Sequence, residues 1–281
     1  MMNRTQLHPL LRALVARPYP AVMGVLNVTP DSFSDGGQFL APDHALAHAK
    51  AMIAAGADIV DIGAESTRPY GATPVSAVDE LKRLQAILTV VAALGVPVSI
   101  DSMKADITAW ALDNGAAMAN DVWGLQRDPD MARIIAERGA PVVVMHNRES
   151  ADPAIDIVKD IGAYFARSLA IAAKAGIPAG NIVLDPGIGF GKTPEQSMTA
   201  LARLDELCQF GSPLLVGASR KRFIDTVTPS QPHQRLGGSL AAHLLAARRG
   251  AAIIRAHDVA ETVQALKVQT AIEAKTAGDR E

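Results

Sequence analysis

The chain has 281 residues, of which 49% are apolar and 20% are charged, and its formal net charge is −2. This composition supplies enough apolar residues for a large core, which excludes a disordered protein, and the length lies within the range of one α/β barrel. A net charge this close to zero lacks the basic surplus typical of nucleic-acid-binding proteins.

No run approaches the ~20 apolar residues that a membrane span needs, so we expect no membrane partner. The single cysteine, Cys208, excludes an internal disulfide framework and is typical of a reducing compartment. We therefore expect a cytoplasmic globular protein that binds neither nucleic acid nor a membrane.

In chain order, eight short runs rich in apolar and β-branched residues are separated by longer segments with helical spacing. The runs cover residues 21–28, 58–63, 96–101, 117–122, 141–146, 181–186, 213–219 and 251–258. Strands that alternate with helices predict βα units and a parallel sheet.

Two of the intervening segments carry helix start and stop signals. Asp152–Pro153 offers an N-cap and a first-turn proline, and Gly176 stands where that helix would end. Similarly, Ser76 predicts the start of a helix whose apolar stripe covers residues 81–91 and whose end is Gly95.

An open doubly wound sheet and a closed (β/α)8 barrel both fit this alternation, and two features favour the barrel. Eight similar units fit its usual length. Polar residues also stand at nearly every strand end, whereas an open sheet gathers its site at one switch point. These residues are Asn27, Asp61, Asp101, Asn120, His146, Asp185, Ser219, Arg255 and His257. We predict a single (β/α)8 TIM-barrel domain over residues 1–281, with peripheral tails at about 1–20 and 274–281.

The stretch IVLDPGIGFGKT, residues 182–193, resembles a phosphate-binding P-loop at first reading. A Walker A motif needs glycine where Pro186 stands, and proline lacks both the glycine conformations and a backbone N–H. Asp185 would also bring a carboxylate beside the phosphates. A P-loop is therefore disfavoured, and a glycine-rich turn with no ligand remains the plain alternative.

The long first loop, LNVTPDSFSDGGQF from residue 26, offers hard oxygen ligands. Asn27, with Asp31 or Asp35, can help to hold Mg²⁺, which accepts few protein ligands together with phosphate and water. A solvated surface loop is the alternative for such a composition.

The second loop, from residue 63, places Thr67 beside Arg68, and a hydroxyl next to a guanidinium suits phosphate oxygens. A simple pair between Glu65 and Arg68 would also explain these residues. Residues 219–221, Ser-Arg-Lys, follow an apolar strand where a helix can begin, so backbone N–H groups there are available for an anion.

Together the strand ends provide two sets of groups. One set suits an anion: Asn27, Thr67, Arg68, Arg255 and His257. The other suits a flat, nitrogen-rich ring: Asp101, Asn120, Asp185 and Lys221. Buried carboxylates are costly unless they accept hydrogen bonds, and the guanidine-like edge of a pterin or purine supplies the donors.

Seven motifs, in order, resemble those of the bacterial dihydropteroate synthase family, over residues 21–268. They are LNVTPDSFSDGG, ESTRP, SIDSMK, NDV, LDPGIGFGK, GASRKRF and IIRAHDV. The resemblance implies a (β/α)8 barrel, a homodimer, and a place in folate biosynthesis. It also implies a reaction that joins 6-hydroxymethyl-7,8-dihydropterin diphosphate to p-aminobenzoate and releases pyrophosphate.

The resemblance further implies a role for each matching residue. It places Asp101, Asn120, Asp185 and Lys221 on the pterin. It places Thr67, Arg68, Arg255 and His257 on the diphosphate. Asn27 is implied at Mg²⁺, Arg255 also against the pterin ring, and Ser219 near the p-aminobenzoate carboxylate. Of these, we expect Arg68, Asp101, Lys221, Arg255 and His257 to be catalytic.

Two segments depart from the family pattern: the second loop is one residue longer around Tyr70, and the turn after His146 is unusual. The chemistry needs no strong base, because an aromatic amine is already nucleophilic at pH 7. Stabilising the departing diphosphate is the harder task, which favours a dissociative, SN1-like substitution. A barrel methyltransferase that binds a methylated folate and a non-catalytic pterin-binding protein remain as alternatives.

Overall fold

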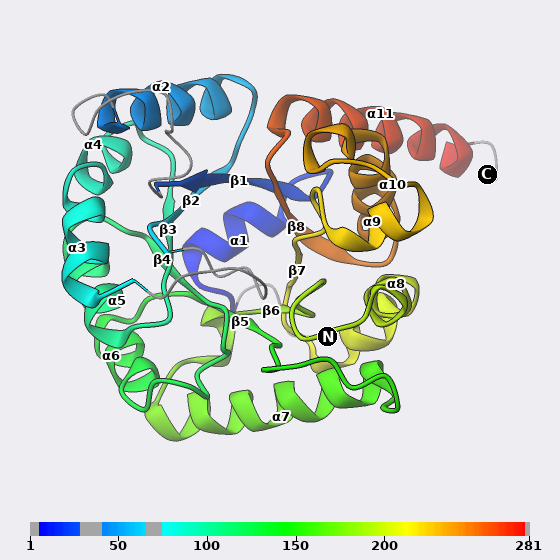
Figure 1. Cartoon of the computed structure of the whole chain (residues 1–281). Coiled ribbons are helices and arrows are strands. Elements are labelled where there is room, and N and C mark those ends of the chain that lie inside the picture. Colours follow the sequence, from blue (N-terminus) through cyan, green and yellow to red (C-terminus); the bar gives the residue numbers. More distant parts are fainter. Residues whose placement is uncertain (1–5, 29–40, 66–74, 279–281) are drawn as a thin grey trace.

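Eight parallel strands close into a barrel in their sequence order, with β8 paired to β1 (Figure 1). The computed structural model describes residues 6–28, 41–65 and 75–278. The strands are β1 (Ala21–Asn27), β2 (Ile59–Gly63), β3 (Val98–Asp101), β4 (Met118–Asp121), β5 (Val142–Met145), β6 (Ile182–Asp185), β7 (Leu214–Val216) and β8 (Ala251–Ala256). All eight predicted strands and the predicted barrel are confirmed.

Helices surround the barrel and cover the outer faces of its strands (Figure 1). They are α2 (Ala41–Ala54), α3 (Ala77–Gln85), α4 (Leu88–Ala92), α5 (Ala105–Asp113), α6 (Met131–Arg138), α7 (Ile157–Ala175), α8 (Pro194–Ala202), α9 (Arg222–Val227), α10 (Leu236–Arg248) and α11 (Val259–Gly278). Short 3₁₀ turns cover Ala179–Asn181, Leu204–Phe210 and Pro232–Gln234. Alternate strand residues point outward to the helices and inward to the barrel, so the strands are buried on both faces.

The N-terminal segment is not a peripheral tail, and that prediction is wrong. Helix α1 (Pro9–Val15) lies within the ring of strands in Figure 1 and closes one end of the barrel. Leu7, Leu11 and Leu14 pack in one cluster with inward-facing strand residues such as Met23 and Ile59. Because these leucines recur at helical spacing, one face of α1 buries apolar surface that the barrel floor would otherwise expose to water. At the other end of the chain, the expected tail is helical as far as Gly278.

Two helix boundaries differ from expectation. Ser76 is the N-cap and accepts from the Asp79 N–H as predicted, but the 81–91 stripe is divided between α3 and α4. Helix α7 begins at Ile157, where the carboxylate of Asp156 caps it, whereas Asp152 accepts from the Ala154 N–H in a preceding turn. A local capping preference is satisfied equally well by a turn, so sequence placed this start too early.

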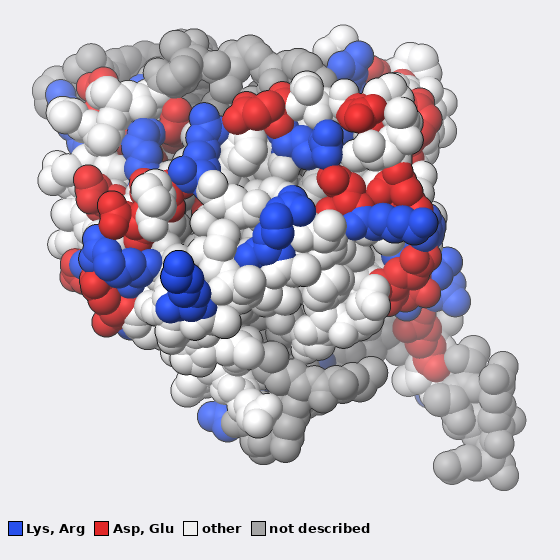
Figure 2. Space-filling model, turned by 90° about the horizontal axis from the view of Figure 1, so that it is seen from below, with Lys and Arg blue, Asp and Glu red and all other residues white. Residues whose placement is uncertain are grey.

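The outer surface mixes charges of both signs. On the face shown in Figure 2, which includes the side covered by α7 in Figure 1, Lys and Arg alternate with Asp and Glu around a broad uncharged area. The described residues on this face therefore form no extended basic surface. Within the described ranges, no helix is long and apolar enough to cross a bilayer.

Candidate active site

The polar residues predicted at the strand ends meet at the carboxyl-terminal mouth of the barrel. Strand register places Asp101 of β3 between Gly63 of β2 and Asn120 of β4, and Asp185 of β6 beside Met145 of β5. A cavity at this mouth is lined by Asp101, Asn120, Val122, Met145, Asp185, Gly187, Ile188, Phe190, Gly217, Lys221 and Arg255. It contains the whole set predicted for a nitrogen-rich ring.

Arg255 is the central cation of this cavity. Its Nε donates to Asp61 Oδ2 at 2.7 Å, and its NH2 donates to Asp101 Oδ2 at 2.9 Å. Asn120 Nδ2 donates to the same Asp61 oxygen at 3.1 Å. Asp61, which is fully buried, thus orients two predicted site residues. Sequence reasoning gave it no role, although its place at a strand end was a usable signal.

Asp101 keeps one acceptor for a ligand. Its Oδ1 is buried and has no hydrogen-bond partner among the described residues. Burial raises the pKa of Asp101 to about 7, an effect that the neighbouring Arg255 only partly offsets and that Asp61 reinforces. A ligand that donates a hydrogen bond here would relieve the cost of burying this carboxyl.

Asp185 ends β6 and faces the same cavity, and the glycines after it shape the turn. Its Oδ1 accepts from the Gly187 N–H at 2.7 Å. Gly187 has φ +64, and a Cβ there would lie 2.0 Å from the His146 carbonyl oxygen, so this position requires glycine. Burial raises the pKa of Asp185 to about 6. The lysine of the P-loop-like sequence, Lys192, points into the protein interior and contacts the turn. These contacts give the glycines a structural function in this turn.

The segment after β7 contributes Lys221 and Ser219 to the mouth, while Arg220 leaves it. Lys221 Nζ lies 4.0 Å from the centre of the Phe190 ring. Ser219 Oγ lies 3.0 Å from His257 Nδ1. Arg220 instead pairs with Asp258, with Nε 3.0 Å from Oδ2. Of the predicted basic pair, only Lys221 reaches the cavity.

His257 is neutral in this setting. It is partly buried, and burial lowers its pKa to about 3, with Arg255 and Arg220 lowering it further. A neutral imidazole can donate a hydrogen bond from one ring nitrogen and accept one at the other.

Asn27 reaches the rim of the site from β1. Its Oδ1 and Asp101 Oδ2 lie 3.7 and 3.6 Å from the position that a Cβ on Gly63 would occupy, so the glycine leaves a gap between two oxygen donors. Asp101 Oδ2 already accepts from Arg255 NH2, so of these two oxygens the Asn27 amide oxygen is the one that suits Mg²⁺, an ion that takes few protein ligands together with phosphate and water. Within the described ranges, no three acidic, histidine or cysteine side chains form a cluster that could hold a metal.

Thr67, Arg68 and Tyr70 lie outside the described residues, as do Asp31 and Asp35. The alternative partner for Arg68 is nevertheless engaged. Glu65 accepts from Lys104 Nζ at 2.5 Å and from the Val75 N–H at 3.0 Å.

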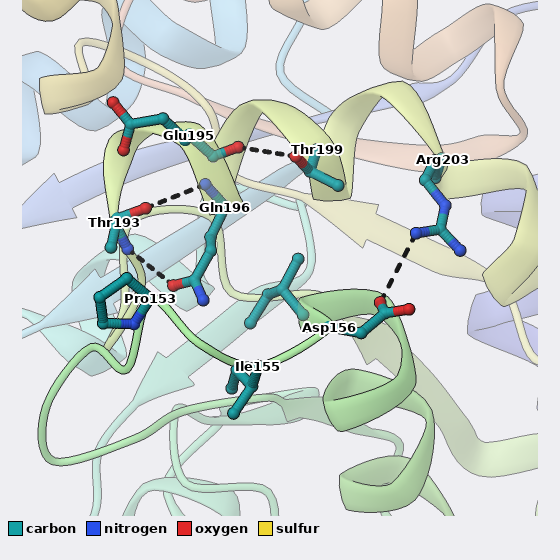
Figure 3. Close-up of a pocket in the computed structure, with 9 residues that line it drawn as sticks. Pro153, Ile155, Asp156, Thr193, Glu195, Gln196, Thr199 and Arg203 are labelled. Atoms are coloured by element: carbon teal, nitrogen blue, oxygen red, sulfur yellow. Dashed lines mark hydrogen bonds and ion pairs between the residues drawn. The ribbon is translucent and has the colours of Figure 1, made fainter.

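A second pocket lies outside the barrel, between the start of α7 and α8 (Figure 3). Thr193 and Gln196 cap each other across the first turn of α8, and Arg203 NH1 lies 3.5 Å from Asp156 Oδ1. None of the predicted site residues lines this pocket. Thr193 is thus paired with Gln196 and Arg203 with Asp156, whereas the residues predicted to hold the ring lie at the barrel mouth.

Comparison with known proteins agrees with this site. The family model for pterin binding enzymes matches residues 23–257. The dihydropteroate synthase of Bacillus subtilis is 42% identical over 273 residues, which cover 96% of this chain and 95% of that protein. The chain belongs to the dihydropteroate synthase family. It is therefore a transferase of folate biosynthesis.

Two further matches define the extent of the likeness. The structure of a Xanthomonas albilineans dihydropteroate synthase with 4-aminobenzoic acid aligns with a TM-score of 0.88 at 43% identity, covering 91% of this chain and 94% of that one. A probable bifunctional folylpolyglutamate synthase/dihydropteroate synthase of Haloferax volcanii is 46% identical over 257 residues. The match covers 89% of this chain but only 30% of the Haloferax protein, so the similarity concerns one part of that longer protein.

Proposed function

We propose that the barrel mouth is where pterin diphosphate and p-aminobenzoate are joined, with the residue roles that follow. The observation that carries the proposal is the Arg255 guanidinium held between Asp61 and Asp101, beside a third buried carboxyl at Asp185. Asp101 Oδ1 is a buried acceptor without a hydrogen-bond partner among the described residues, and a ligand rich in N–H donors would satisfy it.

Pterin recognition falls to Asp101, Asn120, Asp185 and Lys221. The unpartnered Oδ1 of Asp101 and the carboxyl of Asp185 accept from the pterin N–H groups, and Lys221 donates to its oxygen or ring nitrogen. Phe190, with Lys221 above its ring, forms an apolar wall. Arg255 lies along the ring, since it lines the same cavity.

The diphosphate is assigned to Arg255, His257, Thr67 and Arg68. Arg255 and His257 belong to the last strand and the residue after it, two positions apart, so both side chains leave the same face. Thr67 and Arg68 are assigned from the family motif alone. Guanidinium groups stabilise the negative charge that develops on a departing diphosphate. Such electrostatic stabilisation of the transition state is usually the largest single contribution to catalysis.

Mg²⁺ is the cofactor that this assignment implies, with Asn27 as its protein ligand. When bound, the ion would neutralise part of the diphosphate charge. The position of the Asn27 amide oxygen next to Gly63, at the end of β1, supports this placement.

The bond exchange is dissociative. The C–O bond between the methylene carbon and the diphosphate breaks, and the electron pair leaves with pyrophosphate. Asp101 and Asp185 stabilise the cationic methylene that remains conjugated with the pterin. The amine nitrogen of p-aminobenzoate then forms the C–N bond and loses a proton to water. Ser219, near the mouth, would hold the carboxylate of that substrate.

The deciding experiment measures pyrophosphate release. We expect p-aminobenzoate to raise the rate of pyrophosphate release from pterin diphosphate and Mg²⁺, with one dihydropteroate formed for each pyrophosphate released in its presence. Pterin diphosphate binding without release would instead indicate a non-catalytic pterin-binding protein. Methyl transfer from a methylated folate would indicate the barrel methyltransferase. Either result would overturn the proposal.

The family resemblance also supports a homodimer that acts in the cytoplasm as one domain over residues 1–281. The chain has a mass of 29.5 kDa, so light scattering should give twice that value. A mass equal to one chain at working concentration would refute the dimer.

A further inference from the structure

A buried lysine lies behind the glycine turn of the pterin cavity. Lys192 is 6% exposed, and its Nζ has three partners: the carbonyl oxygens of Gly187 at 2.9 Å and Phe190 at 3.1 Å, and His146 Nδ1 at 2.6 Å. Three acceptors match the three N–H donors of an ammonium group, so the lysine is fully satisfied in its charged form. No step of the reaction uses it.

Lys192 is linked to α7 by a series of hydrogen-bonded side chains. His146 Nδ1 accepts from Lys192, which leaves Nε2 protonated to donate to Asp160 Oδ2 at 2.9 Å. Asp160 of α7 also accepts from Arg148 NH1 at 3.0 Å. Arg148 belongs to the turn after His146 that departs from the family pattern. This turn therefore connects α7 to the network that ends at Lys192.

Both carbonyls that Lys192 holds belong to residues of the cavity wall. Gly187 donates its N–H to the Asp185 carboxylate at 2.7 Å while its carbonyl accepts from Lys192. Phe190 presents its ring to Lys221 while its carbonyl accepts from Lys192. One ammonium group thus fixes the peptide that orients Asp185 and the backbone that places Phe190.

We propose that Lys192 is a positioning residue for pterin binding, and that His146 and Asp160 act through it. The proposal rests on the assignment of Asp185 to the pterin. Lys192 does not touch the substrate. Its function is to fix the turn over residues 187–190, so that the Asp185 carboxylate and the Phe190 ring already have their binding geometry in the ligand-free protein.

Burial shifts the pKa of both His146 and Lys192. Burial, and then the charge of Lys192, lower the pKa of His146 to about 3, so the imidazole stays a neutral acceptor. Burial lowers the pKa of Lys192 to about 7, while Asp185 and Asp160 favour its charge and Lys221 and Arg148 oppose it. Burial therefore works against the ammonium, and the three acceptors around Nζ are the observation that favours the charged form.

The test compares Lys192→Met with a matched control, Asn181→Ala. Asn181 is also 6% exposed and also holds a carbonyl, that of Gly139 at 2.8 Å, but it stands before β6, at the opposite end of the same strand. Calorimetry would measure affinity for 6-hydroxymethylpterin, which lacks the diphosphate, and separately for Mg²⁺-pyrophosphate.

Lys192→Met should weaken pterin binding by about tenfold or more, the scale of one lost hydrogen bond to a charged group, and change pyrophosphate binding by less than about twofold. Asn181→Ala should lower thermal stability and leave both affinities unchanged. Unchanged pterin affinity in Lys192→Met overturns the proposal. An equal loss for both ligands also overturns it, because that result indicates general damage.

A second pair of variants covers the case in which Lys192→Met does not fold. His146→Gln keeps an acceptor for Lys192 and a donor for Asp160, whereas His146→Leu keeps neither. Pterin affinity should survive the first change and fall in the second. Equal affinities in the two variants would contradict the role of His146.

Asp185→Asn separates this proposal from the assignment on which it rests. If Asp185→Asn loses pterin affinity and Lys192→Met does not, only the role of Lys192 fails. If Asp185→Asn binds pterin as the unmodified protein does, the assignment of Asp185 fails, and the role of Lys192 fails with it.

Discussion

At the residue scale, Asp185 both anchors the turn that follows β6 and lines the predicted pterin cavity. Its carboxylate receives the Gly187 N–H and faces a cavity at a strand end. Asp185→Asn keeps the shape but replaces one acceptor with a donor that faces ligand donors. We expect pterin affinity to fall by about 2–3 kcal/mol, the range for a lost charge-assisted hydrogen bond with a mismatched partner. Calorimetry that shows unchanged affinity would remove Asp185 from the pterin site.

The raised pKa values of Asp101 and Asp185 predict that pterin binding releases protons. Their carboxyls have pKa values of about 7 and about 6, so both are partly protonated at pH 6.5. Donors of the pterin favour the ionised forms, which lowers both pKa values in the complex. We expect release of roughly one proton per pterin at pH 6.5, and weaker binding as the pH falls to 5. Calorimetry in buffers of different ionisation enthalpy measures this number, and the same heat in every buffer would contradict the prediction.

His257 tests the division between the two ligands. Removing its imidazole in His257→Ala should weaken Mg²⁺-pyrophosphate binding by about tenfold, the scale of one hydrogen bond to a charged group. The affinity for 6-hydroxymethylpterin should stay nearly unchanged, because His257 is absent from the cavity lining. Equal losses for the two ligands would indicate structural damage.

At the scale of elements, the turn between β6 and α8 is built from glycines with positive φ packed against the neighbouring β5 loop. Gly187→Ala would force a left-handed alanine and place its Cβ 2.0 Å from the His146 carbonyl oxygen. Gly139→Ala is the matched control, since Gly139 has φ +61 and an added Cβ would meet no atom within 4 Å. We expect the control to cost about 1–2 kcal/mol and Gly187→Ala to cost more than about 3 kcal/mol.

Urea unfolding of both variants checks this difference. Gly187→Ala should also lose pterin affinity, since the displaced peptide orients Asp185. Equal stabilities for the two alanine variants would show that the turn yields to the added Cβ and that its packing does not demand glycine.

At the scale of the whole molecule, the α1 leucines that fill the barrel floor and the residues of the candidate site lie at opposite ends of the barrel. Leu11 of α1 is fully buried in the barrel floor, whereas the site lies at the opposite mouth. Leu11→Ala should cost about 2–5 kcal/mol of unfolding free energy, as for other buried leucines, and leave kcat/KM unchanged. Leu245→Ala, at a position 39% exposed on α10, should cost less than about 1 kcal/mol. A fall in kcat/KM in Leu11→Ala would show that the floor and the mouth are coupled.

The sequence by itself determined the barrel and the composition of the site. Alternating strands and helices are local patterns, and a polar residue at a strand end is a local feature. A closed parallel barrel places all strand ends at one mouth, so Asp101, Asn120, Asp185 and Arg255 could be grouped without knowing any distance. The assignment of these four residues, and of Asn27, Thr67, Arg68, Ser219, Lys221 and His257, to ligands stays a prediction.

Only the tertiary structure decided which of these groups touch. Arg255 pairs with Asp61 and Asp101, which lie 194 and 154 residues away in the chain, and no local pattern encodes such pairs. The position of Lys192 was likewise decided by the tertiary structure. The P-loop-like motif suggests a phosphate ligand, but the folded chain buries this lysine against His146. Helix α1 is a further case, because seven residues give a weak local signal, and the unfilled barrel floor decides where they pack. Side chains meet according to the geometry of the closed barrel, and that geometry exists only after the last strand has paired with the first.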